Sequence, residues 1–379
     1  MNFNMKTYIT KYKTLCTTNT KVLNDLVYPQ RVHWMPELFA KVKTGLSYVP
    51  HEMANRVATK DIVDYVKANP VDGKTGFLLA AGSQGWAGGK SKNQETPSEV
   101  DYTYKLGILT MTHIFAGRMA GVFEAYDYVA TDASACASSI KCMMDVQNLI
   151  NNLGFDRVIV LALEDPTAKL TLEFFGQSGA NLLLKHEEEG KIPSAFDSKN
   201  GGFVIGQGAG LAIFESERAV QKNAVKPEAE LKSAWVSAEQ LSNPIGQRPD
   251  GQGYQRAIMG AITQAKCQPS DIKIVKTHGT GTPTNNQSEK NALLSTLRGG
   301  FIATSYKQHI GHTVAASGLL ETGLILDDIK KGVIPGIKNR TENDDTFISK
   351  DTTAPDGLLM SLAAGMGNIY AAAIFDPRV

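Results

Sequence analysis

One cysteine, two histidines and one lysine stand in segments rich in small residues. Cys136 lies in "TDASACASSI", directly ahead of an apolar helical pattern. His278 follows a strand-like run in "IVKTHGTGTP", and Lys307 and His312 lie five residues apart in "SYKQHIGHTVAAS". A thiolate is a good nucleophile that forms thioesters, and neutral imidazoles can donate N–H bonds to a developing oxyanion. These residue types therefore suit acyl transfer through a thioester on the cysteine.

Each of these residues, taken singly, also has a purely structural explanation. Free cysteine is among the most buried residue types, so Cys136 alone could be a packed core thiol. His278 could cap a turn in its glycine-rich loop, His312 could be a polar group at a helix N-terminus, and Lys307 could be a solvated charge. No role is assigned to the remaining thiols and histidines: Cys16, Cys142, Cys267, His33, His51, His113, His186 and His309.

Composition limits the classes of function. The 379 residues are 42% hydrophobic and 20% charged, which is typical of a globular protein. Lysine plus arginine (39) nearly cancels aspartate plus glutamate (38), so no global field indicates nucleic acid as a partner. The four cysteines lack the spacing of a metal site or a disulfide framework. Without an apolar signal segment or membrane span, the sequence predicts a cytoplasmic protein that neither binds a metal nor contacts a membrane.

Strand-like and helix-like segments alternate along the chain in two sets. The first set includes "TGFLLAAGS", "YDYVATD" and "RVIVLAL", with the helical pattern "SSIKCMMDVQNLINNLG" between them. After "SERAVQKNAVKPE" a second set begins, with the helix-like "QRAIMGAITQAK", the strand-like "IKIVKTH" and a terminal "IYAAAIF". Such alternation favours an α/β fold with buried sheets. We expect two similar halves, 1–220 with the cysteine and 221–379 with the histidines and the lysine.

Four motifs, in order, resemble those of one enzyme family. "VATDASACASSI" resembles D-T-A-C-A-S-S, "THGTGTPTNNQSE" resembles H-G-T-G-T-x-x-G-D-x-x-E, and "SYKQHIGHTVAASGLLE" resembles S-x-K-x-x-x-G-H-x-x-x-A-A-G. "FDSKNGGFVIGQGAGLAIFES" is similar to F-D-x-x-R-D-G-F-V-x-G-E-G-A-G. These are motifs of the β-ketoacyl-acyl carrier protein synthases of the thiolase superfamily, specifically the elongating Cys-His-His type. The resemblance runs from about residue 74 to the C-terminus and is faint before it.

The resemblance implies a fold, an activity and residue roles. The fold would be thiolase-like, with two α/β halves related by a pseudo-twofold axis and stacked in five layers (αβαβα). The activity would be decarboxylative Claisen condensation of an acyl thioester with malonyl-acyl carrier protein, in fatty acid or polyketide-type biosynthesis. Cys136 would carry the acyl group, and His278 and His312 would stabilise the enolate. Lys307 would act electrostatically, with Glu289 as its counter-charge.

Further roles follow from the same resemblance. Thr280 and Thr282 would hydrogen-bond the phosphopantetheine arm of the carrier protein, which is the substrate carrier, and no other cofactor is implied. The backbone N–H groups of Cys136 and Met366 would form an oxyanion hole over the acyl-enzyme carbonyl. A helix that begins beside Cys136 would lower the pKa of its thiol.

The C-terminal loop departs from the family pattern. Ala-Gly-Met-Gly-Asn at 364–368 stands where the family has Phe-Gly-Phe-Gly-Gly. Met366 would then gate the acyl pocket, with Gly365 and Gly367 allowing the loop to move. The alternative is that Met366 is only packed core.

Other departures keep a second function open. Asn285 and Asn286 replace the family's Gly-Asp, and Gln207 replaces a usual acid. None of these removes a group that does chemistry, which favours a specialised enzyme. The alternative is a catalytically weak, ketosynthase-like scaffold or partner subunit that binds acyl carrier protein.

Two kinds of partner are expected. The resemblance implies a homodimer, or a heterodimer with a related ketosynthase. Acyl carrier proteins are acidic, so a local basic patch could steer them. Arg56 and Lys60 in "MANRVATKDIVDYV" are candidates, although a solvated helix face explains them equally well.

Overall fold

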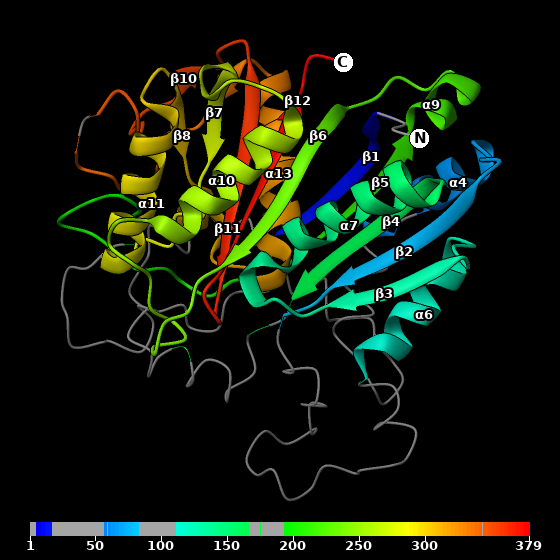
Figure 1. Ribbon diagram of the computed structural model, residues 1–379, viewed down its shortest axis with the longest axis horizontal. Helices are drawn as coiled ribbons and strands as arrows, with labels where there is room; N and C mark the ends of the chain where they lie inside the picture. Colours follow the sequence, from blue (N-terminus) through cyan, green and yellow to red (C-terminus); the bar gives the residue numbers. More distant parts are fainter. Residues whose placement is uncertain are drawn as a thin grey trace, which may run out of the picture.

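Five strands of the first half lie side by side in the computed structural model (Figure 1). The structure describes residues 5–16, 57–58, 60–82, 111–164, 166, 175, 193–342 and 344–379. These strands are β1 (Thr7–Cys16), β2 (Lys74–Ala80), β3 (Tyr128–Asp132), β4 (Phe155–Glu164) and β5 (Gly208–Ser216). They are ordered β3-β2-β4-β5-β1: β2 is parallel to β3 and β4, whereas β5 is antiparallel to β4 and β1.

The second half repeats this arrangement. Its strands are β6 (Ala229–Ala238), β7 (Ile272–Lys276), β8 (Ile302–Thr304), β11 (Leu358–Gly365) and β12 (Ile369–Asp376). They follow the order β6-β12-β11-β7-β8, which is the order of the first half reversed, with matching parallel and antiparallel pairs. Antiparallel pairing of β1 with β6 joins the halves into one ten-stranded sheet. The two halves are therefore related as a pseudo-twofold repeat. A separate small sheet pairs β9 (Val333–Ile334) with β10 (Thr352–Thr353).

Helices cover the sheet in three layers. The strands alternate their side chains between faces, as along β2, where Leu78 and Ala80 face the central helices and Phe77 and Leu79 face the outer ones. The central helices are α7 (Ser138–Leu153) and α13 (Ser317–Lys330), which pack against both halves of the sheet. The outer helices are α4 (Lys60–Ala68) and α6 (Thr112–Val122) on the first half, and α10 (Gln252–Ala265) and α11 (Pro283–Leu297) on the second. With each half of the ten-stranded sheet counted as one layer, the layers run helix, sheet, helix, sheet, helix. This order confirms the expected thiolase-like fold.

Short elements complete the described chain. A one-turn helix η3 (Ala135–Ala137) precedes α7, and its counterpart η6 (Val314–Ala316) precedes α13. The remaining elements are α9 (Glu217–Asn223), which links the halves, η5 (Pro269–Asp271) and α12 (Lys307–Ile310). Within the described residues, no helix is long and apolar enough to cross a membrane.

The two central helices begin in the same way. Ala135 in η3 and Val314 in η6 both have left-handed backbone angles, with φ of 48° and 43°. The connections from the preceding strands differ, because β3 is separated from η3 by residues 133–134 and β8 from η6 by residues 305–313. The second half therefore carries an insertion ahead of its central helix. That insertion contains two of the residues singled out from the sequence.

Candidate active site

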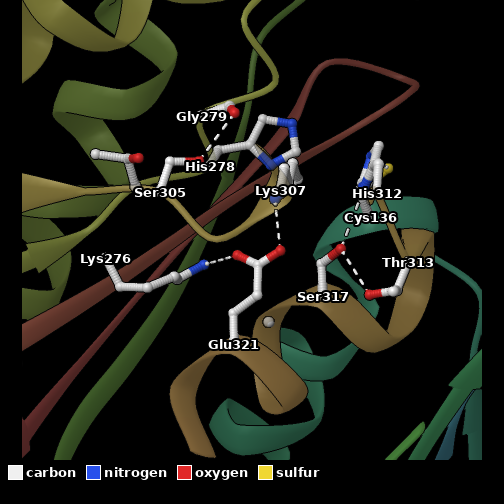
Figure 2. A network of polar contacts seen from close by, with 12 residues as sticks. Cys136, Lys276, His278, Gly279, Ser305, Lys307, His312, Thr313, Ser317 and Glu321 are labelled. Carbon is white, nitrogen blue, oxygen red and sulfur yellow. Dashed lines mark hydrogen bonds and ion pairs between the residues drawn. The ribbon is translucent and has the colours of Figure 1, made fainter. Parts of the chain in front are cut away.

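Cys136 and His312 meet at the start of the two central helices (Figure 2). The Sγ atom of Cys136 lies 3.1 Å from Nε2 of His312. The other ring nitrogen, Nδ1, accepts the backbone N–H of Val314 at 3.3 Å and lies 3.1 Å from the Ser317 hydroxyl. Because Nδ1 is an acceptor, the ring proton is on Nε2 and points to the sulfur. His312 is thus placed to stabilise a thiolate, or an oxyanion that forms beside it.

The electrostatic state of Cys136 differs from the expectation. Burial raises the pKa of its thiol to about 12, and this outweighs the positive charge of Lys307, which acts in the opposite direction. The prediction of a lowered pKa was therefore wrong for the protein without substrate. The helix start near the sulfur does not compensate for the loss of water around it.

His278 lies beside His312, on the loop that follows β7. The two ring centroids are 5.6 Å apart and the ring planes meet at 82°. His278 is buried, and its Nδ1 atom has no hydrogen-bond partner among the described residues. Burial and then the nearby Lys307 lower the pKa of each histidine well below its ordinary value. Both rings are therefore neutral at neutral pH, as enolate stabilisation through N–H donation requires.

The counter-charge of Lys307 is Glu321, and the prediction of Glu289 was wrong. Lys307 Nζ lies 2.9 Å from Glu321 Oε1, and Lys276 Nζ lies 3.1 Å from Glu321 Oε2 (Figure 2). All three side chains are fully buried, or within one per cent of it. Glu321 projects from α13 between the two lysines, so one carboxylate bridges two ammonium groups.

Glu289 instead holds the loop that carries His278. Its carboxylate accepts the backbone N–H of His278 at 2.5 Å and that of Gly279 at 2.9 Å. The side-chain amide of Asn285 donates to it at 2.9 Å, and Asn285 in turn accepts from the Tyr254 hydroxyl at 2.7 Å. The asparagine that departs from the family pattern therefore belongs to the hydrogen-bond network that positions His278.

The predicted pantetheine contacts are close together in the same loop. Thr280 Oγ1 and Thr282 Oγ1 lie 3.2 Å apart, with Thr280 buried and Thr282 half-buried at the N-cap of α11. Between them, Gly281 has φ of 76°, and a Cβ there would collide with the carbonyl oxygen of Ser194. Their use by a substrate arm stays a prediction.

The C-terminal loop lies against the cysteine. A Cβ at Gly365 would collide with the carbonyl oxygen of Ser134, which immediately precedes η3. Met366 packs on the apolar cluster that contains Cys136. The turn is tied down on its other side, because Gly367 N–H donates to the Pro244 carbonyl at 2.7 Å. The structure therefore places Met366 on the cluster that contains Cys136, on a turn that is held at Gly367.

Residues 203–206 of the first half hold His312 in place. The sequence did not indicate this contact. His312 N–H donates to the Val204 carbonyl at 2.6 Å, and its own carbonyl accepts Gly206 N–H at 3.0 Å. The Phe203 ring meets the imidazole edge to face, with centroids 5.0 Å apart. A Cβ at Gly206 would lie 2.6 Å from the Ile310 carbonyl oxygen, so the close approach needs glycine. Gly206 of "GGFVIGQGAG" thus allows the two backbones to approach closely.

Lys276 and Glu321 are not among the site residues predicted from the sequence, although each leaves a signal there. Lys276 ends the apolar strand "IKIV" on the same face as Ile274, and Glu321 is the one charge in "SGLLETGLIL". A charge at an inward position of a buried element indicates a partner inside the protein.

The candidate basic patch consists of Arg56 and Lys60. Arg56 lies outside the described residues. The Lys60 side chain is 91% exposed and pairs with Asp64 at 2.6 Å on the same helix. Its accessibility is compatible with carrier docking but gives no evidence for it.

Family models match most of the chain. The β-ketoacyl synthase N-terminal domain matches residues 52–219, and the β-ketoacyl synthase C-terminal domain matches residues 228–341. The chain belongs to the β-ketoacyl synthase family. The motif resemblance is therefore confirmed.

Individual relatives of the chain are distant in sequence. It is 26% identical over 254 residues to the tetracenomycin polyketide synthase ketoacyl synthase alpha subunit of Streptomyces glaucescens, covering 65% of this chain and 59% of that protein. It is 26% identical over 243 residues to 3-oxoacyl-[acyl-carrier-protein] synthase 2 of Synechocystis sp., covering 62% and 57%. The chain thus spans less than two thirds of the length of these relatives.

Solved structures share the fold of the chain. One is a type II PKS acyl-carrier protein in complex with its ketosynthase bound to the hexaketide, at a TM-score of 0.78 and 20% identity. Another is the ishigamide ketosynthase/chain length factor, at a TM-score of 0.75 and 18% identity. Each match covers 98% of this chain and 99% of the other.

Proposed function

We propose that the protein is an elongating β-ketoacyl synthase that condenses an acyl group with a malonyl unit, both delivered as thioesters of acyl carrier protein. The observation that supports this best is the 3.1 Å contact between Cys136 and His312, with His278 beside them. A scaffold has no need of a buried thiol aligned with two neutral imidazoles.

The geometry suits a reaction in two stages. First, the Cys136 sulfur attacks the acyl thioester, the carrier thiol leaves, and the acyl group remains on the enzyme. Next, the malonyl thioester loses carbon dioxide, and the electron pair released forms an enolate whose oxygen accepts N–H bonds from His278 and His312. The enolate carbon then attacks the acyl carbonyl and releases the cysteine. We further propose that the amides of Cys136 and Met366 receive the carbonyl oxygen in both acyl-transfer steps.

A non-elongating partner subunit is the second candidate. The description of one matching structure as a ketosynthase/chain length factor favours it, since such a complex contains two related chains. The complete set of cysteine, two histidines and lysine in this chain argues for the catalytic member. The proposed assembly is a dimer with a second copy or with a related chain, located in the cytoplasm.

The decisive experiment follows the carrier protein by mass. The purified protein is incubated with acyl- and malonyl-acyl carrier protein, and the carrier-bound products are weighed. Elongation adds the mass of the condensed two-carbon unit to the acyl chain, and Cys136→Ala abolishes that product. A protein that binds carrier protein but yields no product, with and without candidate partner ketosynthases, would show that the scaffold interpretation holds.

A further inference from the structure

Lys276 is a buried charge to which the proposed reaction gives no role. It is the last residue of β7 and lies two residues before His278. Its side chain is fully buried and donates to Glu321 Oε2 at 3.1 Å and to the Leu362 carbonyl at 2.6 Å. Figure 2 shows Lys276 and Lys307 approaching the Glu321 carboxylate from different sides.

The first half of the protein shows that the fold does not need this ion pair. Ala81 N–H donates to the carbonyl at the end of β3, as Thr277 N–H donates to the carbonyl at the end of β8. Ala80 therefore occupies the position equivalent to Lys276. By the same repeat, Cys142, four residues into α7, is equivalent to Glu321, four residues into α13.

Equivalent positions thus hold an apolar pair in one half and an ion pair in the other. Ala80 and Cys142 are both buried in the central core. Replacing such a pair by buried ions costs desolvation free energy that their mutual attraction often fails to recover. The second half therefore retains Lys276 and Glu321 for something other than packing.

Three charged side chains surround the ammonium group of Lys276. Glu321 faces it from α13 and Lys307 from α12, while Glu289 of α11 exerts a weaker attraction. The Glu289 carboxylate is already bound to the amides of His278 and Gly279 and to Asn285.

The two lysines act in the same sense on both imidazoles. After burial, the positive charges of Lys307 and Lys276 contribute to the lowered pKa of His278 and of His312. Lys307 alone would suffice to neutralise Glu321. Lys276 therefore adds a second ammonium group next to a single carboxylate.

We propose that Lys276 is a second positioning residue of the active site, which fixes Glu321 from the strand side and adds positive potential behind the two histidines. That potential disfavours protonation of the rings and favours the negative charge that develops on an enolate. This inference rests on the proposed ketosynthase function.

Removal of Lys276 gives a test that separates this role from packing. Lys276→Met leaves Lys307 paired one to one with Glu321, so the variant should fold, with a melting temperature lowered by the loss of the bond to the Leu362 carbonyl. Without the second charge, the histidine rings become easier to protonate. The acid midpoint of malonyl decarboxylation should therefore rise by about one pH unit. At the optimum pH, kcat should fall about tenfold, with KM within about twofold.

Two further variants and a second readout keep the test decisive. Lys276→Gln retains hydrogen bonding without charge and should shift the midpoint like Lys276→Met. Lys273→Met removes a lysine from the same strand, but one that is not part of the buried cluster, and should shift nothing. The histidine titrations are also followed by NMR of ring-labelled protein, which needs no turnover. Absence of turnover in the unmodified protein would contradict the proposed function. Histidine midpoints that stay unchanged in both Lys276 variants would overturn the inference, whatever happens to stability.

Discussion

The sulfur of Cys136 and Nε2 of His312, which belong to residues 176 positions apart, lie 3.1 Å from each other. The thiol is buried enough for its pKa to rise to about 12, so little thiolate forms unless a donor stabilises it.

We expect His312→Ala to slow the alkylation of Cys136 by iodoacetamide at pH 8 by about tenfold, because the thiolate loses its N–H donor. The rate is measured by mass spectrometry of the labelled peptide. His309→Ala is the matched control, because His309 Nε2 contacts the Gly336 carbonyl and not the sulfur. Equal labelling of all three proteins would exclude His312 as the stabilising group.

Cys136→Ala should abolish acyl-enzyme formation and leave malonyl decarboxylation measurable. In the proposed reaction the thiol carries the acyl group, whereas the enolate needs only the two histidines. Intact-protein mass after incubation with acyl-acyl carrier protein reports the first step, and release of carbon dioxide reports the second. Cys142→Ala, a buried cysteine of the same helix region, should acylate normally. An acyl adduct on Cys136→Ala would show that another residue is the nucleophile.

Decarboxylation should persist at a lower pH than an ordinary histidine would allow. Free imidazole titrates near 6.5, and on that basis the sequence predicts a fall between about pH 6 and 7. Burial lowers the pKa of His278 and His312 well below the ordinary value, so the neutral, donating rings survive to lower pH and the fall moves below that range. A pH–rate profile of the Cys136→Ala variant isolates this step from acylation. A midpoint at or above 6.5 would contradict neutral histidines as the donors.

The sequence predicts those site residues whose position is determined by their neighbours in the chain. Cys136, His278 and His312 are identifiable because each sits in a glycine- or alanine-rich segment at the end of a strand or the start of a helix. The end of a strand also fixes where the residue lies in an α/β fold. Their convergence therefore follows once the fold class is known.

Properties that depend on packing were not predictable in the same way. Glu289 and Glu321 are both acids in helices downstream of motif residues, and spacing alone does not say which one faces Lys307. The thiol pKa was misjudged because burial is set by the whole fold and not by the adjacent helix. Strand β11 was not assigned, because "LLMSLAAG" lacks the β-branched residues that mark strands.

Met366→Phe should narrow the range of acyl donors and leave decarboxylation nearly unchanged. Methionine has three rotatable side-chain bonds and adapts to its surroundings, whereas a phenylalanine ring in the cluster with Cys136 is rigid. Because the turn is anchored through Gly367, the selectivity should arise from the side chain and not from loop movement. The measurement is the ranking of acyl-acyl carrier proteins by acylation rate. A change in melting temperature with an unaltered ranking would assign Met366 to packing alone.

Reversal of charge at Arg56 and Lys60 should raise the apparent KM for acyl carrier protein and weaken its salt dependence. The reason is the loss of attraction for an acidic partner. The Lys60–Asp64 pair is exposed, so Lys60→Glu should leave the melting temperature nearly unchanged. Reversal at Lys226, an exposed lysine after α9, serves as the comparison. An unchanged KM and salt slope would place the docking surface elsewhere.

The position of β1 in the sheet has a consequence for synthesis of the chain. Of the described strands β1 precedes all others in the sequence, yet its neighbours are β5 and β6, which begin about 200 residues later. At about 5–20 residues per second, a ribosome needs roughly 10 to 40 s to reach them. Throughout that interval the first strand has neither edge paired, and a nascent chain in this state is a target for chaperones. The native pairing of β1 therefore cannot begin before β5 has been translated, and slow codons before β5 would prolong that interval.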